Sequence, residues 1–298
     1  MSTGVPTNRT NVELPADIAK EILEKVQESS AVMQLARQIK LPGRGTTIPV
    51  ILGDVEANWV GETGKSAVSN PNVSKKQMTA YKLSVIVPFS NEFKRDLESL
   101  YDELVRRLPA ALGAKFDKTV FGAVSAPGEN FDTFASATAQ NIGTNTYDGL
   151  VAADGDIAAH DGITNGYVIS PKGKSILLTA KDTTGRPIFI NNVAEGAVPM
   201  ILGAKTTMSK GAYKASSGSG TSAVPATVGV AGDWTQALYG TVEGVKITIS
   251  DQATLDLQDS DNTTINLWQQ DMFAVKAEIE VGFRADVACF NKLTAAGL

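Results

Sequence analysis

The 298-residue chain contains a single cysteine, Cys289, and a single histidine, His160, which argues against several classes of protein at once. One cysteine excludes a disulfide framework, and the apolar run around Cys289 favours a buried, inert thiol. Zinc sites need three or four ligands of this kind, so the sequence does not favour zinc. A nucleophilic Cys–His pair would require the fold to bring two sequence-distant residues together, and no G-x-S-x-G motif of a serine hydrolase occurs.

The chain also lacks a long hydrophobic run and an excess of positive charge. No run of about 18 apolar residues occurs, so the sequence predicts no transmembrane span. The polar N-terminal segment lacks the apolar core of a signal peptide. A net charge of −5 is unlike that of a basic nucleic-acid-binding domain. The composition is that of an ordinary globular protein made and used in a reducing cytoplasm.

Motifs that would bind phosphate or metal are incomplete. The sequence Gly173-Lys-Ser175 follows a predicted strand, but a phosphate-binding loop would need glycine where Val168 stands, and Pro171 lacks a backbone amide. Two acidic groups lack the glycine and glutamate frame of a calcium loop, and we expect solvated turns there: Asp154, Asp156 and Asp161, and Asp259 with Asp261. We therefore expect no catalytic residue, no metal and no cofactor.

The most informative stretch that is present covers residues 45–88. Extended runs at 47–52 and 80–87 flank a polar stretch at 61–76, which predicts a long two-stranded ribbon. Ordering about 40 residues costs roughly 40–80 kcal/mol of backbone entropy. Burial alone would offset this only with on the order of 1,600–3,200 Å² of apolar surface. An obligate subunit interface supplies such an area.

The ribbon therefore favours a protein that works as an assembly, and the alternative is a flexible surface hairpin. On the first interpretation, side chains of the ribbon contact a neighbouring subunit. The residues that we expect to do so are Trp59, Glu62, Lys65, Lys75 and Lys76.

Apolar periodicity predicts the other elements. A helical stripe runs through Ile18, Ile22 and Val26 and resumes after Ser30 at Val32, Leu35 and Ile39; a long amphipathic helix of roughly 30 residues begins near Phe93 and contains Pro109. Residues 128–240 have an α/β pattern, with helices expected at 147–159 and 171–180 and strands at 166–170 and 227–239. Strands are also expected at 242–249 and 273–283, the last with strict alternation.

The order of these parts resembles that of tailed-phage major capsid proteins, whose architecture is called the Hong Kong ninety-seven fold. Each motif is weak alone, and their order over nearly the whole chain carries the resemblance. The stretches concerned are 57–62 (ANWVGE), 87–96 (VPFSNEFKRD), 117–122 (DKTVFG), 167–171 (YVISP), 177–189, 232–234 (GDW) and 273–293.

The resemblance implies an α+β phage major capsid fold in five parts. These are an N-terminal arm and helix (1–44), an extended β-hairpin loop (45–88), a long spine helix of the peripheral domain (89–126), an α/β axial domain (127–240) and peripheral-domain strands (241–298). Some members of the family crosslink a lysine of the extended loop to a distant asparagine. Candidates would be Lys65, Lys75 and Lys76 with Asn191, Asn192 and Asn291, but no catalytic glutamate can be assigned.

The implied function is structural and not enzymatic: a subunit that self-assembles into the icosahedral capsid around a double-stranded DNA phage genome. The implied partners are copies of the chain in hexamers and pentamers, a separate scaffolding protein, a portal and non-specifically contacted packaged DNA, with no membrane. The protein would be made in the bacterial host cytoplasm and reside in the virion capsid. The alternatives are an encapsulin-like nanocompartment shell and a small-molecule-binding α/β enzyme built on residues 128–240.

Overall fold

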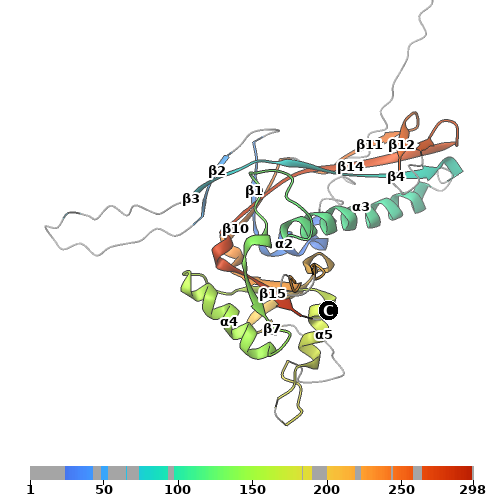
Figure 1. The fold of residues 1–298 in the computed structure, drawn as a ribbon. Helices are drawn as coiled ribbons and strands as arrows, with labels where there is room; N and C mark the ends of the chain where they lie inside the picture. The colour runs from blue at the N-terminus through green and yellow to red at the C-terminus, as the bar shows by residue number, and fades with distance from the viewer. Residues whose placement is uncertain are drawn as a thin grey trace, which may run out of the picture. The chain divides into compact units, whose positions relative to one another are not determined.

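The structure is a computed structural model that describes residues 24–42, 48–52, 65, 74–92, 97–182, 184–189, 200–218, 223–242, 244–257 and 264–296. These residues form a mixture of helices and strands (Figure 1). The chain divides into two compact units: a smaller one of Met1–Val26, Lys82–Leu112 and Glu243–Glu280, and a larger one of Gln27–Tyr81, Gly113–Val242 and Val281–Leu298.

A six-stranded mixed sheet forms the main layer of the larger unit. Its order is β5 (Thr138–Asn141), β15 (Phe290–Ala295), β9 (Ala226–Gly232), β6 (Gly166–Ile169), β8 (Ala204–Met208) and β7 (Met200–Ile201). β6 is parallel to β8, and β15 is parallel to β5, whereas the other pairs are antiparallel. The parallel pair β6 and β8 is joined by a crossover that contains α5 (Pro171–Thr179), as parallel strands require.

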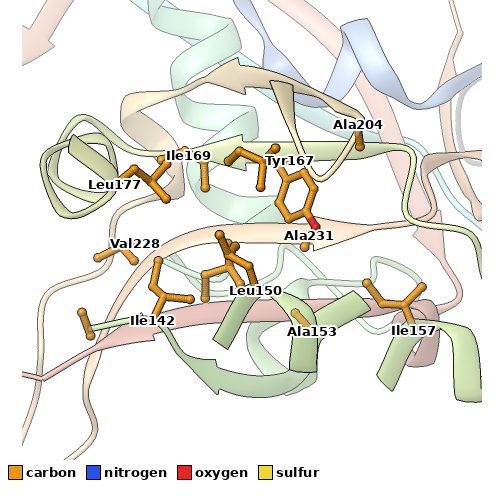
Figure 2. Packing of buried hydrophobic residues seen from close by; sticks show 13 residues of the cluster. Ile142, Leu150, Ala153, Ile157, Tyr167, Ile169, Leu177, Ala204, Val228 and Ala231 are labelled. Atoms are coloured by element: carbon orange, nitrogen blue, oxygen red, sulfur yellow. The ribbon is translucent and has the colours of Figure 1, made fainter. Parts of the chain in front are cut away.

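Two helices cover this sheet, and their first turns explain where they begin. Asn145 caps α4 (Thr146–Ala159) by accepting a hydrogen bond from the Asp148 amide, and Ser170 caps α5 in the same way through Gly173. Both helices send side chains into one buried cluster, in which Leu150 lies beside the strand residues Tyr167 and Ala231 (Figure 2). The helices and the strand expected at 166–170 are therefore confirmed to within a few residues.

A second sheet contributes β1 (Arg37–Lys40), β10 (Ala237–Thr241) and the end of β14 (Met272–Ala285) to the larger unit. Residues 24–29 are helical, and Ser30 caps the short helix α2 (Ala31–Leu35). The expected continuation of the helical stripe to Ile39 is wrong, because the chain becomes extended at Ala36 and Ile39 lies in β1. Ile39 still packs against a buried cluster, that of Leu41, Met78, Leu238 and Val242.

A two-stranded ribbon is present, but its returning strand differs from the expected one. β2 (Ile48–Leu52) pairs antiparallel with β3 (Ser74–Met78) and with no other strand among the described residues. The expected return strand at 80–87 belongs to β4 (Tyr81–Ser90), which pairs with β14. The apolar run of β4 is explained by that partner, since Phe89 stacks on Phe273 with ring centroids 5.6 Å apart.

The smaller unit is organised around β14. This strand pairs antiparallel with β11 (Lys246–Ser250), and a separate hairpin joins β12 (Thr254–Asp256) to β13 (Thr264–Asn266). Phe273, Val275, Ala277 and Ile279 are at most 1% exposed, which confirms the predicted alternation. The intervening Glu278 forms ion pairs with Lys276 and Lys82. The hydrogen bonds that these two lysines donate hold the pKa of the Glu278 carboxyl below its usual range.

The long amphipathic helix is α3 (Leu97–Val120), and it continues through Pro109. Its apolar positions Leu108, Leu112, Phe116 and Val120 are buried, as the periodicity predicts. The strand expected at 227–239 is instead two strands, because Asp233 ends β9. Its carboxylate caps the short helix η5 (Trp234–Gln236), and β10 begins after that helix.

Candidate assembly site at the root of the ribbon

Strand β3 is tied to the body of the larger unit by a cluster of polar side chains. Arg284, in β14, donates from Nη1 to Asp132 Oδ1 at 2.8 Å and from Nε to the Gln77 carbonyl at 2.6 Å. Its Nη2 donates to Asn130 Oδ1 at 2.8 Å. Lys76 Nζ donates to Asp132 Oδ2 at 3.1 Å and to the Ala285 carbonyl at 2.7 Å. We call this set of residues the root cluster.

The root cluster is largely removed from water. The side chains of Arg284 and Asp132 are 9% and 18% exposed, whereas that of Lys76 is 27% exposed. Charged hydrogen bonds in such a setting are about twice as strong as neutral ones, and removing one partner leaves the other buried without compensation. The cluster therefore fixes the end of β3, the strand by which the ribbon joins the rest of the larger unit.

Aromatic packing supports the loop that supplies Asp132. Phe131 contacts Tyr81, Phe116 and Phe283, with ring centroids 6.0–6.2 Å apart. The hydroxyl of Tyr81 accepts a hydrogen bond from the Asn130 amide at 3.2 Å. The backbone of Asp132 itself donates to the Phe283 carbonyl. This loop is thus held from both sides, and the carboxylate of Asp132 has a fixed position.

A second polar cluster, also inside the larger unit, surrounds Asp117 at the end of α3. Asp117 Oδ1 accepts from Ser30 Oγ at 2.6 Å, and Oδ2 accepts from Ser209 Oγ at 2.6 Å. The amides of Ala31 and Val32 donate to the same carboxyl at 3.1 Å and 3.4 Å. Asp117 is 1% exposed, and this burial raises the pKa of its carboxyl against the opposing effect of the hydrogen bonds.

The residues predicted to contact a neighbour are only partly described. Trp59 and Glu62 lie outside the described residues, and so does the side chain of Lys75, whose backbone is in β3. Lys65 is exposed. Lys76 has an intramolecular role in the root cluster that the sequence did not indicate, and a further role between subunits stays a prediction.

Cys289 and His160 are not arranged as a nucleophile and its base. Cys289 Sγ approaches His160, but it contacts the carbonyl oxygen at 3.6 Å, whereas the ring nitrogen Nδ1 lies 2.8 Å from the Asp156 carbonyl. Burial, with lesser effects of nearby aspartates, raises the pKa of the Cys289 thiol to about 11. Among the residues that the structure describes, no group of three or more His, Cys, Asp or Glu side chains could hold a metal.

Two more candidates from the sequence have different surroundings from those expected. Asn291, a candidate for crosslinking, is fully buried and donates to the Ala153 carbonyl at 2.9 Å, which disfavours that role. Asn191 and Asn192 lie outside the described residues. The turn before Gly173 is an ordinary helix cap, in which Ser170 Oγ donates to the Val228 carbonyl at 2.7 Å.

Sequence reasoning assigned no role to Asp117 and did not single out Asp132. Asp117 begins one of the stretches that carry the family resemblance, 117–122, and follows Phe116 on a helix whose apolar positions recur every three or four residues. Asp132 lies in a loop with no periodicity, so nothing in the local sequence distinguishes it.

Comparisons with known proteins agree with this architecture. The model of the phage capsid family matches residues 11–285. The chain belongs to that family. The protein named "Probable major capsid protein gp17" of Mycobacterium phage D29 is 28% identical over 294 residues, covering 94% of this chain and 89% of the relative.

Solved structures show the same fold. A structure from Microbacterium phage Oxtober96 has a TM-score of 0.64 at 22% identity and covers 89% of this chain and 91% of its own. The structure titled "Capsid of empty GTA particle computed with C5 symmetry" has a TM-score of 0.59 at 15% identity, with 90% of each chain covered. The function of this capsid protein is structural: it is a major capsid subunit that forms the shell of a tailed phage. Among the described residues, no helix is long and apolar enough to cross a membrane.

We expect Asp132→Asn to lower the free energy of unfolding of the unassembled subunit by roughly 2–4 kcal/mol, because Arg284 and Lys76 lose their shared carboxylate. Urea denaturation followed by fluorescence measures this change. Asp251→Asn, at an exposed bend, is the matched control and should change stability by less than about 0.5 kcal/mol. Equal effects of the two substitutions would contradict the role of the root cluster.

The raised pKa of Asp117 predicts a specific pH dependence. The folded state holds this proton more tightly than the unfolded state, so the stability due to the group is complete below the ordinary value of 3.8. That stability is lost as pH rises towards the raised folded pKa. Asn does not titrate, so the stability advantage of the wild type over Asp117→Asn should shrink as the pH rises above the ordinary value of 3.8. Urea titrations at several pH values measure this difference in the free energy of unfolding. If the advantage of the wild type grew as the pH rises, the folded state would favour the ionised carboxylate of Asp117, and the prediction would be wrong.

The thiol of Cys289 should be unreactive in the folded protein. With a pKa of about 11, only about one thiol in a thousand is ionised at pH 8. We expect a disulfide reagent such as DTNB to react slowly with the native subunit and rapidly in denaturing urea. Fast reaction of the native protein would show that the thiol is accessible as a thiolate.

Proposed function

We propose that this protein self-assembles through hexamers and pentamers into an icosahedral shell around a double-stranded DNA genome. The ribbon of β2 and β3 would lie over a neighbouring subunit and supply contacts through Trp59, Glu62, Lys65, Lys75 and Lys76. A separate scaffolding protein and a portal would take part in assembly in the bacterial host cytoplasm, and the mature protein would reside in the virion capsid.

The observation that carries this proposal is the pairing of β2 with β3 alone within the described chain. An isolated two-stranded ribbon is marginal in water, so its ordering calls for a surface supplied by another molecule. The root cluster fixes the base of the ribbon, which suits an element that must meet a partner at a defined position.

In this proposal the five-part organisation expected from the sequence corresponds to known parts of the fold. Helix α3 would be the spine helix, and the six-stranded sheet with α4 and α5 would be the axial domain. The strands β4, β11 and β14 of the smaller unit would belong to the peripheral domain. The boundaries at residues 44, 88, 126 and 240 are part of the proposal.

The comparisons do not favour the two alternatives. The relatives and solved structures compared above are named for phages or for capsids, rather than for cargo-filled compartments or enzymes. A structural role without catalysis is accordingly what we propose, and the binding energy would be distributed over subunit contacts.

Replacing residues 61–73 by a short Gly-Ser linker should leave a folded, soluble subunit that forms few or no shells. This deletion removes the tip of the loop with Glu62 and Lys65 but retains Trp59, β3 and Lys76, so the root cluster is preserved. Size-exclusion chromatography and negative-stain microscopy measure assembly, and urea denaturation checks that the subunit is folded. Shells of normal yield and size from the variant would contradict the proposed role of the ribbon.

A further inference from the structure

Positive charge is concentrated in one segment of a chain whose overall charge is −5. The described residues 165–182, 184–189 and 200–218 contain seven basic side chains and a single acidic one, Asp182. The basic residues are Lys172, Lys174, Lys181, Arg186, Lys205, Lys210 and Lys214. Mild overall acidity therefore conceals a local excess of positive charge in the larger unit.

The sheet topology brings several of these lysines to one edge. Strands β6 and β8 are parallel, so both end at the same edge of the sheet, and the antiparallel strand β9 begins there. Lys172 lies three residues after the end of β6, and Lys210 lies two residues after the end of β8. The backbone of Lys214 exchanges two hydrogen bonds of 3.0 Å with Thr227, close to the start of β9.

Two contacts place parts of this edge: the turn after Lys210 lies against α3, and Lys172 lies beside Tyr213. A β-carbon built on Gly211 would lie 3.0 Å from the backbone nitrogen of Lys118, so the turn after Lys210 lies directly against the last turn of α3. Lys172 Nζ donates to Tyr213 Oη at 2.9 Å and stands 4.3 Å from the centre of that ring. We call Lys118, Lys172, Lys210 and Lys214 the basic edge.

The charges of the basic edge are not neutralised within the described part of the chain. Lys118, Lys172, Lys210 and Lys214 are exposed, and no described carboxylate forms an ion pair with any of them. The nearby Asp117 is buried and accepts four hydrogen bonds, so it presents no exposed carboxylate to the edge. The charge of Lys214 also affects a neighbouring lysine. Burial is the main cause that lowers the pKa of the Lys292 side chain, and the positive charge of Lys214 lowers it further.

We propose that the basic edge binds the phosphate backbone of duplex DNA on the inner surface of the shell. This inference rests on the proposed function, which places a genome inside, and it adds the residues that contact that genome. Lysines act as flexible point charges that follow phosphates without reading bases. Such binding does not depend on the DNA sequence. The inner surface of a shell requires this, because it contacts many different sequences of the packaged genome.

Duplex DNA fits the basic edge better than a protein partner or a single strand. A protein partner is usually anchored by buried aromatic or arginine side chains, whereas the four charges of the edge are all lysines. Single strands stack their bases on open aromatic rings, but Tyr213 is only partly exposed and the Lys172 ammonium lies over its ring.

The test measures binding of a short labelled duplex of random sequence to the unassembled full-length subunit as a function of salt. The triple variant Lys118→Gln, Lys210→Gln, Lys214→Gln should bind about tenfold more weakly at low salt, and its slope of log K against log salt should fall by about 3. The control triple Arg37→Gln, Lys40→Gln, Lys246→Gln has the same change of charge at exposed positions and should retain the wild-type slope. Equal losses in the two triples, or no loss in either, would overturn the proposal.

Two further measurements assign the partner and the face. Binding of poly-glutamate in the absence of duplex binding would overturn the proposal in favour of an acidic protein segment. Intact empty shells should not bind a long duplex that is added from outside. If they do bind it, and the triple variant Lys118→Gln, Lys210→Gln, Lys214→Gln abolishes that binding, the basic edge lies on the outer surface and the proposal is overturned. Negative-stain microscopy of the same samples distinguishes a failure of the proposed function from a failure of the DNA-binding inference. If the wild type forms no shells, the proposed function fails; if shells form but subunits bind no duplex, only this inference fails.

Discussion

The ion pair between Arg284 and Asp132 is the interaction on which the proposed use of the ribbon depends. Without it, β3 would be joined to the larger unit by the hydrogen bond from Lys76 to the Ala285 carbonyl and by the packing of Met78 in a small apolar cluster. The guanidinium also binds the Gln77 carbonyl and Asn130, so one buried side chain positions strand, loop and sheet together. A ribbon with a fixed base can search for a neighbour's surface with far less loss of freedom than a loop hinged at both ends.

The root cluster and the Asp117 cluster both join segments that are distant in sequence. In each, a carboxylate within an apolar setting accepts hydrogen bonds from segments that are distant in sequence. At the root, the carboxylate is matched by two cations, whereas Asp117 has only neutral donors and a raised pKa. The root carboxylate therefore has charged partners, whereas burial around Asp117 favours its neutral form.

Much of the fold could be predicted because the relevant signals are local. The alternation from Phe273 to Phe283 is sufficient for β14, and the caps Asn145 and Ser170 mark where α4 and α5 begin. Pairing partners could not be predicted, since the extended run at 80–87 has the same pattern whether it returns along β2 or lies beside β14. The position of Ile39 fits a helical stripe and a strand equally well, and its extended backbone decided the matter.

The candidate site was less predictable than the fold for a related reason. Arg284 and Asp132 are 152 residues apart, and neither lies in a local pattern that names the other. The basic edge was hidden by the net charge, which averages over the whole chain.

The hydrogen bonds of Asp117 also set the order in which the chain can be completed. Ser30 lies 87 residues before this carboxyl and Ser209 lies 92 residues after it. A nascent chain that has not yet exposed Ser209 outside the ribosome leaves Asp117 without one of its two hydroxyl partners. The junction of α2, α3 and the turn at Ser209 can therefore close only after Ser209 has been made, which is after more than two thirds of the chain.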